Sequence, residues 1–154
     1  MFDLDKSIEQ GQPVGLKMLG DWKTFYEGLS SISPKARESW LAFDHYYSDA
    51  AFPAALPLIF ADKPKRLLDV GGNTGKWAVQ CAKFDPDVHI TIVDLEKQLV
   101  FARETIQQHG LENRISFHAM DLLDESKALP AGHDAIWMSQ FLDCFSEVDR
   151  KSVV

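Results

Sequence analysis

The run Asp69-Val70-Gly71-Gly72-Asn73-Thr74-Gly75 constrains the fold more than any other feature of the sequence. A short apolar run precedes it and a helical pattern follows it, which predicts a sharp turn from a strand into a helix. Glycine permits such a turn and lets a ligand approach the main chain closely. The helix behind the turn presents unpaired N–H groups to a polar ligand. We therefore expect a ligand over this loop, and a tight structural turn without a ligand is the alternative.

The position of the acid before the loop narrows the kind of ligand. A dinucleotide site has the spacing G-x-G-x-x-G at this place, whereas this loop reads Gly71-x-Asn73-x-Gly75. Asp69, two residues before the first glycine, disfavours a nearby pyrophosphate. It suits a ligand that carries an amino group and a sulfonium. A nicotinamide site is the less favoured reading.

Strands alternate with helices in the second part of the chain. The pattern predicts helices over 76–83 and 96–109 and another that begins at Ser146, and strands over 66–70, 89–93, 115–119 and 135–139. Alternation of this kind indicates parallel βαβ units with right-handed crossovers. We expect an α/β fold with a doubly wound, mainly parallel sheet in which the first and fourth strands pair.

The first part of the chain does not show this alternation of strands and helices. Glycines and a proline punctuate residues 1–30, which predicts loops and short helices. Ser33 can cap a helix, and a second apolar helical stretch over 50–60 is interrupted by Pro53 and Pro57.

The segment Ala61-Asp62-Lys63-Pro64 breaks the chain and predicts a domain boundary. Residues 1–63 then form a helical, substrate-side segment, and residues 64–154 form the binding domain. We expect the sheet to be truncated after its fourth strand, which leaves an apolar strand at the edge. The 154 residues alone should then aggregate, or fold only against a partner or a missing segment.

Two further acids follow predicted strands. Asp94 ends the second strand, about 20 residues beyond the glycine loop, where a carboxylate accepts hydrogen bonds from both ribose hydroxyls. Its alternative role is to cap the next helix. Asp121 follows the third strand, where it can receive an adenine amino group while Leu122 packs on the ring. The carboxyl ends of the strands line the ligand crevice of an open sheet, so these acids should gather there with Asp69.

Composition excludes several other classes of protein. The net charge is −7 and no Lys/Arg cluster occurs, so nucleic acid is not an expected partner. No segment approaches the roughly 20 apolar residues that a membrane helix requires, and the start lacks a signal peptide. Cys81 and Cys144 lie in no paired motif and are predicted to be free thiols in the cytoplasm. The histidines show no metal-ligand spacing, so we expect no metal.

The run Leu67–Gly75 resembles the first motif of class I S-adenosylmethionine-dependent methyltransferases. More narrowly it is similar to the small-molecule O-methyltransferases, which include caffeate, acetylserotonin and hydroxyindole enzymes. That group typically has a third glycine at the place of Asn73, but Asn tolerates positive φ, so the turn should survive. Asp94-Leu95 and Asp121-Leu122 match the ribose and adenine pairs of the family. The resemblance implies S-adenosyl-L-methionine as cofactor, a small hydroxylated aromatic substrate, and a homodimer in the full-length form.

The resemblance assigns further residues near the cofactor and substrate. Ser48 matches a serine near the methionine carboxylate, and Ser139 falls where a lysine or serine lies near the cofactor. The neighbours of Ser48 (His45, Tyr46 and Tyr47) either face the substrate or pack in the core and at an interface. The family has a catalytic histidine where this chain has Asp143. Asp143 can act as the base if burial raises its pKa or the substrate hydroxyl is acidic, and it can equally be a structural cap.

The predicted function is thus transfer of a methyl group to a hydroxyl of a small aromatic molecule. Two alternatives come from other classes. One is a protein that binds the cofactor without catalysis, which the missing histidine favours. The other is a different reaction on the same scaffold, such as decarboxylation or hydroxylation.

Overall fold

The computed structural model describes residues 3–12, 14–22 and 25–145. The chain divides into two compact units, residues 1–44 and residues 45–154. The predicted boundary between residues 63 and 64 stays a prediction. No helix of the described ranges is both long and apolar enough to cross a membrane.

The first unit contains short helical elements. They are α1 (Leu4–Gln10), the 3-10 helix η1 (Val14–Met18) and α2 (Phe25–Gly28), after which α3 (Pro34–Ile59) begins. The prediction of loops and short helices is confirmed for the residues of the range 1–30 that the structure describes. Ser33 caps α3 as predicted, because its Oγ accepts a hydrogen bond from the backbone N–H of Ala36 at 3.3 Å.

Helix α3 runs through both of its prolines, which corrects the predicted interruption. A proline inside a helix removes one backbone hydrogen bond and costs about 3 kcal/mol or more. Pro53 and Pro57 both lie on the exposed side, where water can solvate the freed carbonyls. Phe52 and Leu56 on the other side are buried, with exposed fractions of 6% and 7%. Burial of this apolar side offsets the cost of the prolines.

The second unit contains a parallel sheet in the order β3-β2-β1-β4. Its strands are β1 (Arg66–Val70), β2 (His89–Asp94), β3 (Ile115–Ala119) and β4 (Ala135–Trp137). The predicted parallel pairing of the first and fourth strands is confirmed, and β4 is an edge strand among the described residues. β4 ends two residues earlier than predicted. The chain leaves the sheet there and turns at Gln140, which has a φ of 49°.

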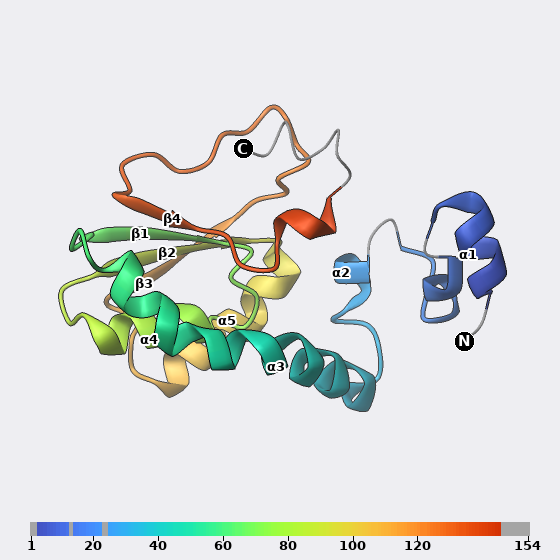
Figure 1. Cartoon of the computed structure of the whole chain (residues 1–154), viewed down its shortest axis with the longest axis horizontal. Coiled ribbons are helices and arrows are strands. Elements are labelled where there is room, and N and C mark those ends of the chain that lie inside the picture. The colour runs from blue at the N-terminus through green and yellow to red at the C-terminus, as the bar shows by residue number, and fades with distance from the viewer. Residues whose placement is uncertain (1–2, 13, 23–24, 146–154) are drawn as a thin grey trace. The chain divides into compact units, whose positions relative to one another are not determined.

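Helices α4 (Lys76–Phe84) and α5 (Glu96–Gln108) pack on one face of the sheet, as Figure 1 shows. Their apolar side chains form the main core with alternate residues of the strands, such as Leu67, Ile90 and Ile92. Trp77 and Trp137 stack in this core with their ring centroids 4.3 Å apart.

The opposite face carries a smaller apolar cluster built from Leu68, Val70, Val93 and Met120. Leu122, Leu129, Met138 and Phe141 pack against it. After β4 the chain forms a 3-10 helix, η2 (Leu142–Cys144), which the sequence did not predict. The helix predicted to begin at Ser146 lies outside the described residues.

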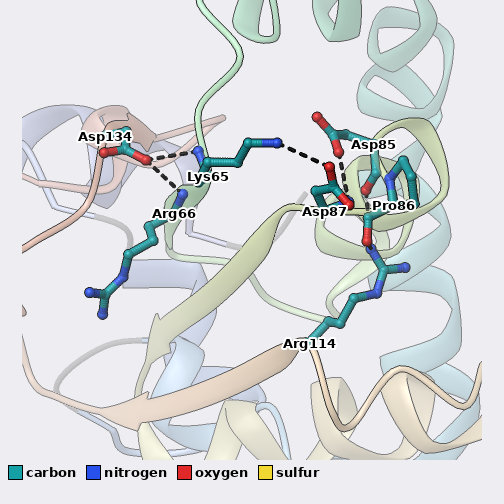
Figure 2. A network of polar contacts seen from close by, with 7 residues as sticks. All are labelled: Lys65, Arg66, Asp85, Pro86, Asp87, Arg114 and Asp134. Atoms are coloured by element: carbon teal, nitrogen blue, oxygen red, sulfur yellow. Dashed lines mark hydrogen bonds and ion pairs between the residues drawn. The ribbon is translucent and has the colours of Figure 1, made fainter.

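A polar network fixes the amino-terminal ends of the strands (Figure 2). Asp134 Oδ2 accepts hydrogen bonds of 2.8 Å from the backbone N–H groups of Lys65 and Arg66, which ties the start of β4 to β1. These bonds, that of Arg66 first, lower the pKa of Asp134. Arg114 donates to the carbonyl oxygens of Asp85 and Pro86 in the turn before β2. The network therefore lies at the amino-terminal ends of the strands, and the glycine loop lies at their carboxyl-terminal ends.

Candidate cofactor site

The glycine loop turns through three residues with left-handed backbone. φ is 72° at Gly71, 51° at Asn73 and 76° at Gly75. The expectation that Asn73 can replace a glycine in this turn is confirmed, since Asn adopts positive φ more readily than most residues. The Gly71 N–H donates to the carbonyl of Val93 at 2.8 Å, which anchors the loop to β2.

Side chains crowd the glycines of this loop. A Cβ on Gly72 would lie 2.7 Å from a methyl group of Ile92 and 2.8 Å from Asp69 Oδ2. A Cβ on Gly71 would collide with the ring of Phe141. Gly71 therefore has a packing reason to be glycine, in addition to any ligand. Phe141 was not among the predicted site residues, because nothing local in the sequence indicates that it returns to the loop.

Asp69 is a buried acid at the end of β1. Its side chain is 2% exposed, and its Oδ2 has no hydrogen-bond partner among the described residues. Burial first, and then the charge of Asp94, raise the pKa of Asp69 to about 8. A buried carboxyl oxygen without a partner is costly, so this atom suits a donor or cation brought by a ligand.

Asp94 holds the loop from the neighbouring strand. Its Oδ2 accepts a hydrogen bond from the backbone N–H of Asn73 at 2.9 Å, and its Oδ1 accepts one from Leu95 at 2.8 Å. Burial raises the pKa of Asp94 to about 6, although these two bonds oppose the shift. The N-cap of α5 is Leu95 and no side chain forms a cap hydrogen bond there, so the alternative role of Asp94 as the helix cap is wrong. Each oxygen keeps one lone pair for a further donor.

The third acid follows β3 at the same edge of the sheet. Asp121 is exposed, and its Oδ1 accepts a hydrogen bond from the Leu123 N–H at 3.0 Å. Leu122 packs against the small apolar cluster. The backbone N–H of Met120 donates to the Asp94 carbonyl at 3.0 Å, which brings this loop to the end of β2.

The residues assigned through the resemblance have different environments. Ser48 is buried, and its Oγ donates to the carbonyl of His45 at 3.4 Å. Ser139 is half-buried in the bend after β4. Asp143 is exposed on η2, so the burial that would favour its role as a base is absent from the described structure. Tyr46 and Tyr47 are 73% and 61% exposed, which contradicts core packing for these two rings.

One contact at the loop was not predicted. His45 Nε2 and Thr74 Oγ1 share a hydrogen bond of 2.8 Å whose donor depends on the ring tautomer. The two residues are 29 positions apart, so no spacing rule pairs them. Of the cysteines, Cys81 is buried and Cys144 is exposed, and neither forms a disulfide within the described residues.

The sequence resembles known proteins over most of its length. A 3-hydroxy-5-methyl-1-naphthoate 3-O-methyltransferase from Streptomyces sahachiroi is 31% identical over 90 residues, which are 58% of this chain and 26% of that protein. A ribosomal RNA small subunit methyltransferase G from Streptococcus pyogenes serotype M12 (strain MGAS2096) is 28% identical over 141 residues, 91% of this chain and 54% of that protein. This chain thus spans between about a quarter and about half of the length of these curated relatives.

A solved structure agrees with the fold. The S-adenosylmethionine-dependent methyltransferase SibL, in its apo form, superposes with a TM-score of 0.62 at 31% identity, over 87% of this chain and 39% of SibL. The sequence model of the O-methyltransferase domain matches residues 55–153, well over half of the chain. The parallel sheet, the glycine loop and this match lead to one conclusion: the chain belongs to the O-methyltransferase domain family.

Proposed function

We propose that this chain carries the S-adenosylmethionine-binding part of a methyltransferase that acts on a hydroxyl of a small aromatic molecule. The name of the naphthoate relative supports the substrate class, and the name of SibL supports the cofactor. The chain covers only part of each relative, so the activity of the whole protein is itself a proposal.

The observation that carries the proposal is the buried, unpartnered Oδ2 of Asp69 beside the charge of Asp94. S-adenosylmethionine brings a sulfonium and an ammonium group, so it supplies the positive charge and the donors that this pair lacks. Two acids beside the glycine loop suit such a ligand better than a pyrophosphate. The residues present therefore fit the cofactor.

Each predicted site residue has a role in the proposal. The cofactor lies over Gly71–Gly75, with the ribose hydroxyls donating to Asp94 beside Leu95 and the adenine at Asp121 and Leu122. Ser48 serves the methionine carboxylate, and Ser139 lies near the cofactor. The further expectations, a homodimer and a cytoplasmic location, also remain proposals.

Methyl transfer requires mainly that the chain positions the acceptor oxygen and the methyl donor. The sulfonium of the bound cofactor supplies an activated methyl group, so holding the acceptor oxygen in line with it gives most of the acceleration. Asp143 is the proposed base, and a carboxylate that is exposed to water is a weak base for a phenol. An exposed Asp143 therefore favours acceptors whose hydroxyl is already acidic, such as phenols with electron-withdrawing groups.

The ribosomal RNA relative supports a second candidate, methylation of RNA. The net charge of −7 opposes it, because binding an RNA backbone relies on lysine and arginine. Binding without catalysis, and a different reaction on the same scaffold, are the remaining alternatives. Product mass after incubation with S-adenosylmethionine and either a hydroxynaphthoate or an RNA hairpin separates all four.

The first test is the affinity of the chain for S-adenosylmethionine, measured by calorimetry. Asp94→Ala removes an acceptor that the ribose and the loop share. Each hydrogen bond to such a charged group contributes roughly 1.5–3 kcal/mol. It should weaken binding more than tenfold. Asp87→Asn, an exposed acid at the other end of the sheet, is the matched control and should change nothing. Absence of binding by the unchanged chain, or equal affinities of the two variants, would contradict the proposal.

A further inference from the structure

One side of α3 follows the glycine loop and the start of α4. Its contacts come from His45, Asp49 and Phe52, which are spaced i, i+4 and i+7 and so lie on one face of the helix. Phe52 packs on Trp77 with ring centroids 5.0 Å apart, and Asp49 forms an ion pair of 2.9 Å with Lys76. His45 makes the contact with the loop itself.

The partner of His45, Thr74, lies in the middle of the glycine loop. Thr74 lies between Asn73 and Gly75, and both of these have left-handed backbone. The Asp94 carboxylate holds the loop on one side through the Asn73 N–H. The hydrogen bond between the His45 ring and the Thr74 hydroxyl holds it on the other side. The residue that follows is Gly75, the N-cap of α4.

We propose that His45 is a positioning residue for the cofactor, which it serves by fixing Thr74 and thereby the free N–H groups at the start of α4. This inference rests on the proposed function. Its Nε2 is engaged by Thr74, so the structure assigns His45 to the loop and not to proton transfer from a substrate. Because α3 comes from outside the strand–loop–helix motif, the loop depends on a distant part of the chain for its shape.

Variants of both partners test this role through the affinity for S-adenosylmethionine. His45→Ala removes one hydrogen bond and should weaken binding roughly threefold to tenfold. His45→Gln places an amide nitrogen near the position of Nε2 and should restore most of the affinity. His45→Asn is too short to reach Thr74 and should behave like alanine. Thr74→Ser keeps the hydroxyl and should bind normally, whereas Thr74→Val should not.

A double-mutant cycle and a neighbouring control separate positioning from a general effect on the fold. The double variant His45→Ala/Thr74→Val should bind no more weakly than the worse of its two parents, because both remove the same bond. Asp49→Ala breaks the exposed ion pair one helical turn away and should leave the affinity unchanged. Additive losses in the cycle, equal behaviour of the Gln and Asn variants, or an equal loss in Asp49→Ala would overturn the proposal.

Hydrogen exchange of the ligand-free chain gives a readout that does not need the cofactor. His45→Ala should speed the exchange of the Thr74 and Gly75 amides while the exchange of β1 stays unchanged. If the unchanged chain binds no S-adenosylmethionine, the proposed function fails, and exchange still decides whether His45 holds the loop. If the chain binds but neither affinity nor exchange responds to His45→Ala, only the positioning role fails.

Discussion

The negative charge of Asp94 acts on the buried carboxyl of Asp69, because the two residues end neighbouring parallel strands at one glycine loop. Burial is the larger cause and this charge the smaller one, and together they raise the pKa of Asp69 to about 8. The pKa of Asp94 itself lies at about 6. At neutral pH the ligand-free loop therefore holds a mostly protonated Asp69 beside an ionised Asp94.

The first prediction concerns stability against pH. In the unfolded chain Asp69 ionises at the ordinary value of 3.8, whereas in the fold it ionises near 8. The folded chain thus binds more protons between these values, so the free energy of unfolding should fall as pH rises from about 4 to about 8.

The neutral variant Asp69→Asn isolates this effect. Its free energy of unfolding, measured in denaturant at pH 5, 6.5 and 8, should decline less with pH than that of the unchanged chain. The variant should therefore be the more stable of the two at pH 8. Parallel pH profiles for the two chains would show that Asp69 is not protonated in the fold.

The second prediction concerns proton release on binding. A cationic ligand favours the ionised form of Asp69, so S-adenosylmethionine should expel its proton near pH 7. S-adenosylhomocysteine has a neutral sulfur and should expel less. Calorimetry in buffers of different ionisation enthalpy counts the protons, and the difference between the two ligands should vanish in Asp69→Asn. Equal proton counts for both ligands in the unchanged chain would contradict this assignment.

The third prediction concerns Gly71 and Phe141. Gly71→Ala adds a Cβ that collides with the Phe141 ring and also strains a residue with φ of 72°, so it should cost roughly 2–4 kcal/mol of stability. Gly110→Ala has a similar φ of 63° but meets nothing within 4 Å, so strain alone should cost about 1–2 kcal/mol. In a chain that also carries Phe141→Ala, the stability cost of Gly71→Ala should come closer to that of Gly110→Ala. Both costs are measured by denaturant unfolding. An unchanged difference would mean that the ring is not what excludes a side chain at Gly71.

The fold was predictable to the extent that local patterns determine it. The bounds of β1 and β3 agree with the prediction, because apolar runs and flanking turn residues mark their ends. The continuous α3 was not predicted, since burial of Phe52 and Leu56 overrides the two prolines and no local rule reports that burial. The early end of β4 depends on the turn at Gln140, which carries no glycine signal.

The candidate site also has some features that local patterns predict and others that they do not. Asp69, Gly71 and Asp94 lie where the motif and the strand ends place them. The contacts that give the loop its shape come from Phe141 and His45, which are distant in sequence from the glycines. Such contacts follow from the packing of whole elements, so spacing along the chain does not reveal them.

The last prediction concerns Arg114, which closes the opposite end of the sheet. Its Nη2 donates to the carbonyl of Ala82 at 2.7 Å, and its Nη1 donates to those of Asp85 and Pro86 at 3.1 Å and 2.9 Å. The guanidinium thereby satisfies carbonyls at and beyond the carboxyl end of α4, where a positive charge is also favourable. Arg114→Ala should reduce the free energy of unfolding by about 2–3 kcal/mol, because charged hydrogen bonds to the part-buried carbonyls of Ala82 and Asp85 are lost.

Two comparisons make the Arg114 prediction specific. Arg114→Lys keeps the charge but cannot serve three carbonyls with one ammonium, so it should recover less than half of the loss. Lys127→Ala breaks only an exposed ion pair with Asp124 and should change stability by less than about 0.5 kcal/mol. Arg114 lies at the amino ends of the strands, so the affinity of its folded variants for S-adenosylmethionine should stay unchanged. A loss of affinity without a loss of stability would place Arg114 in the binding site and overturn its structural role.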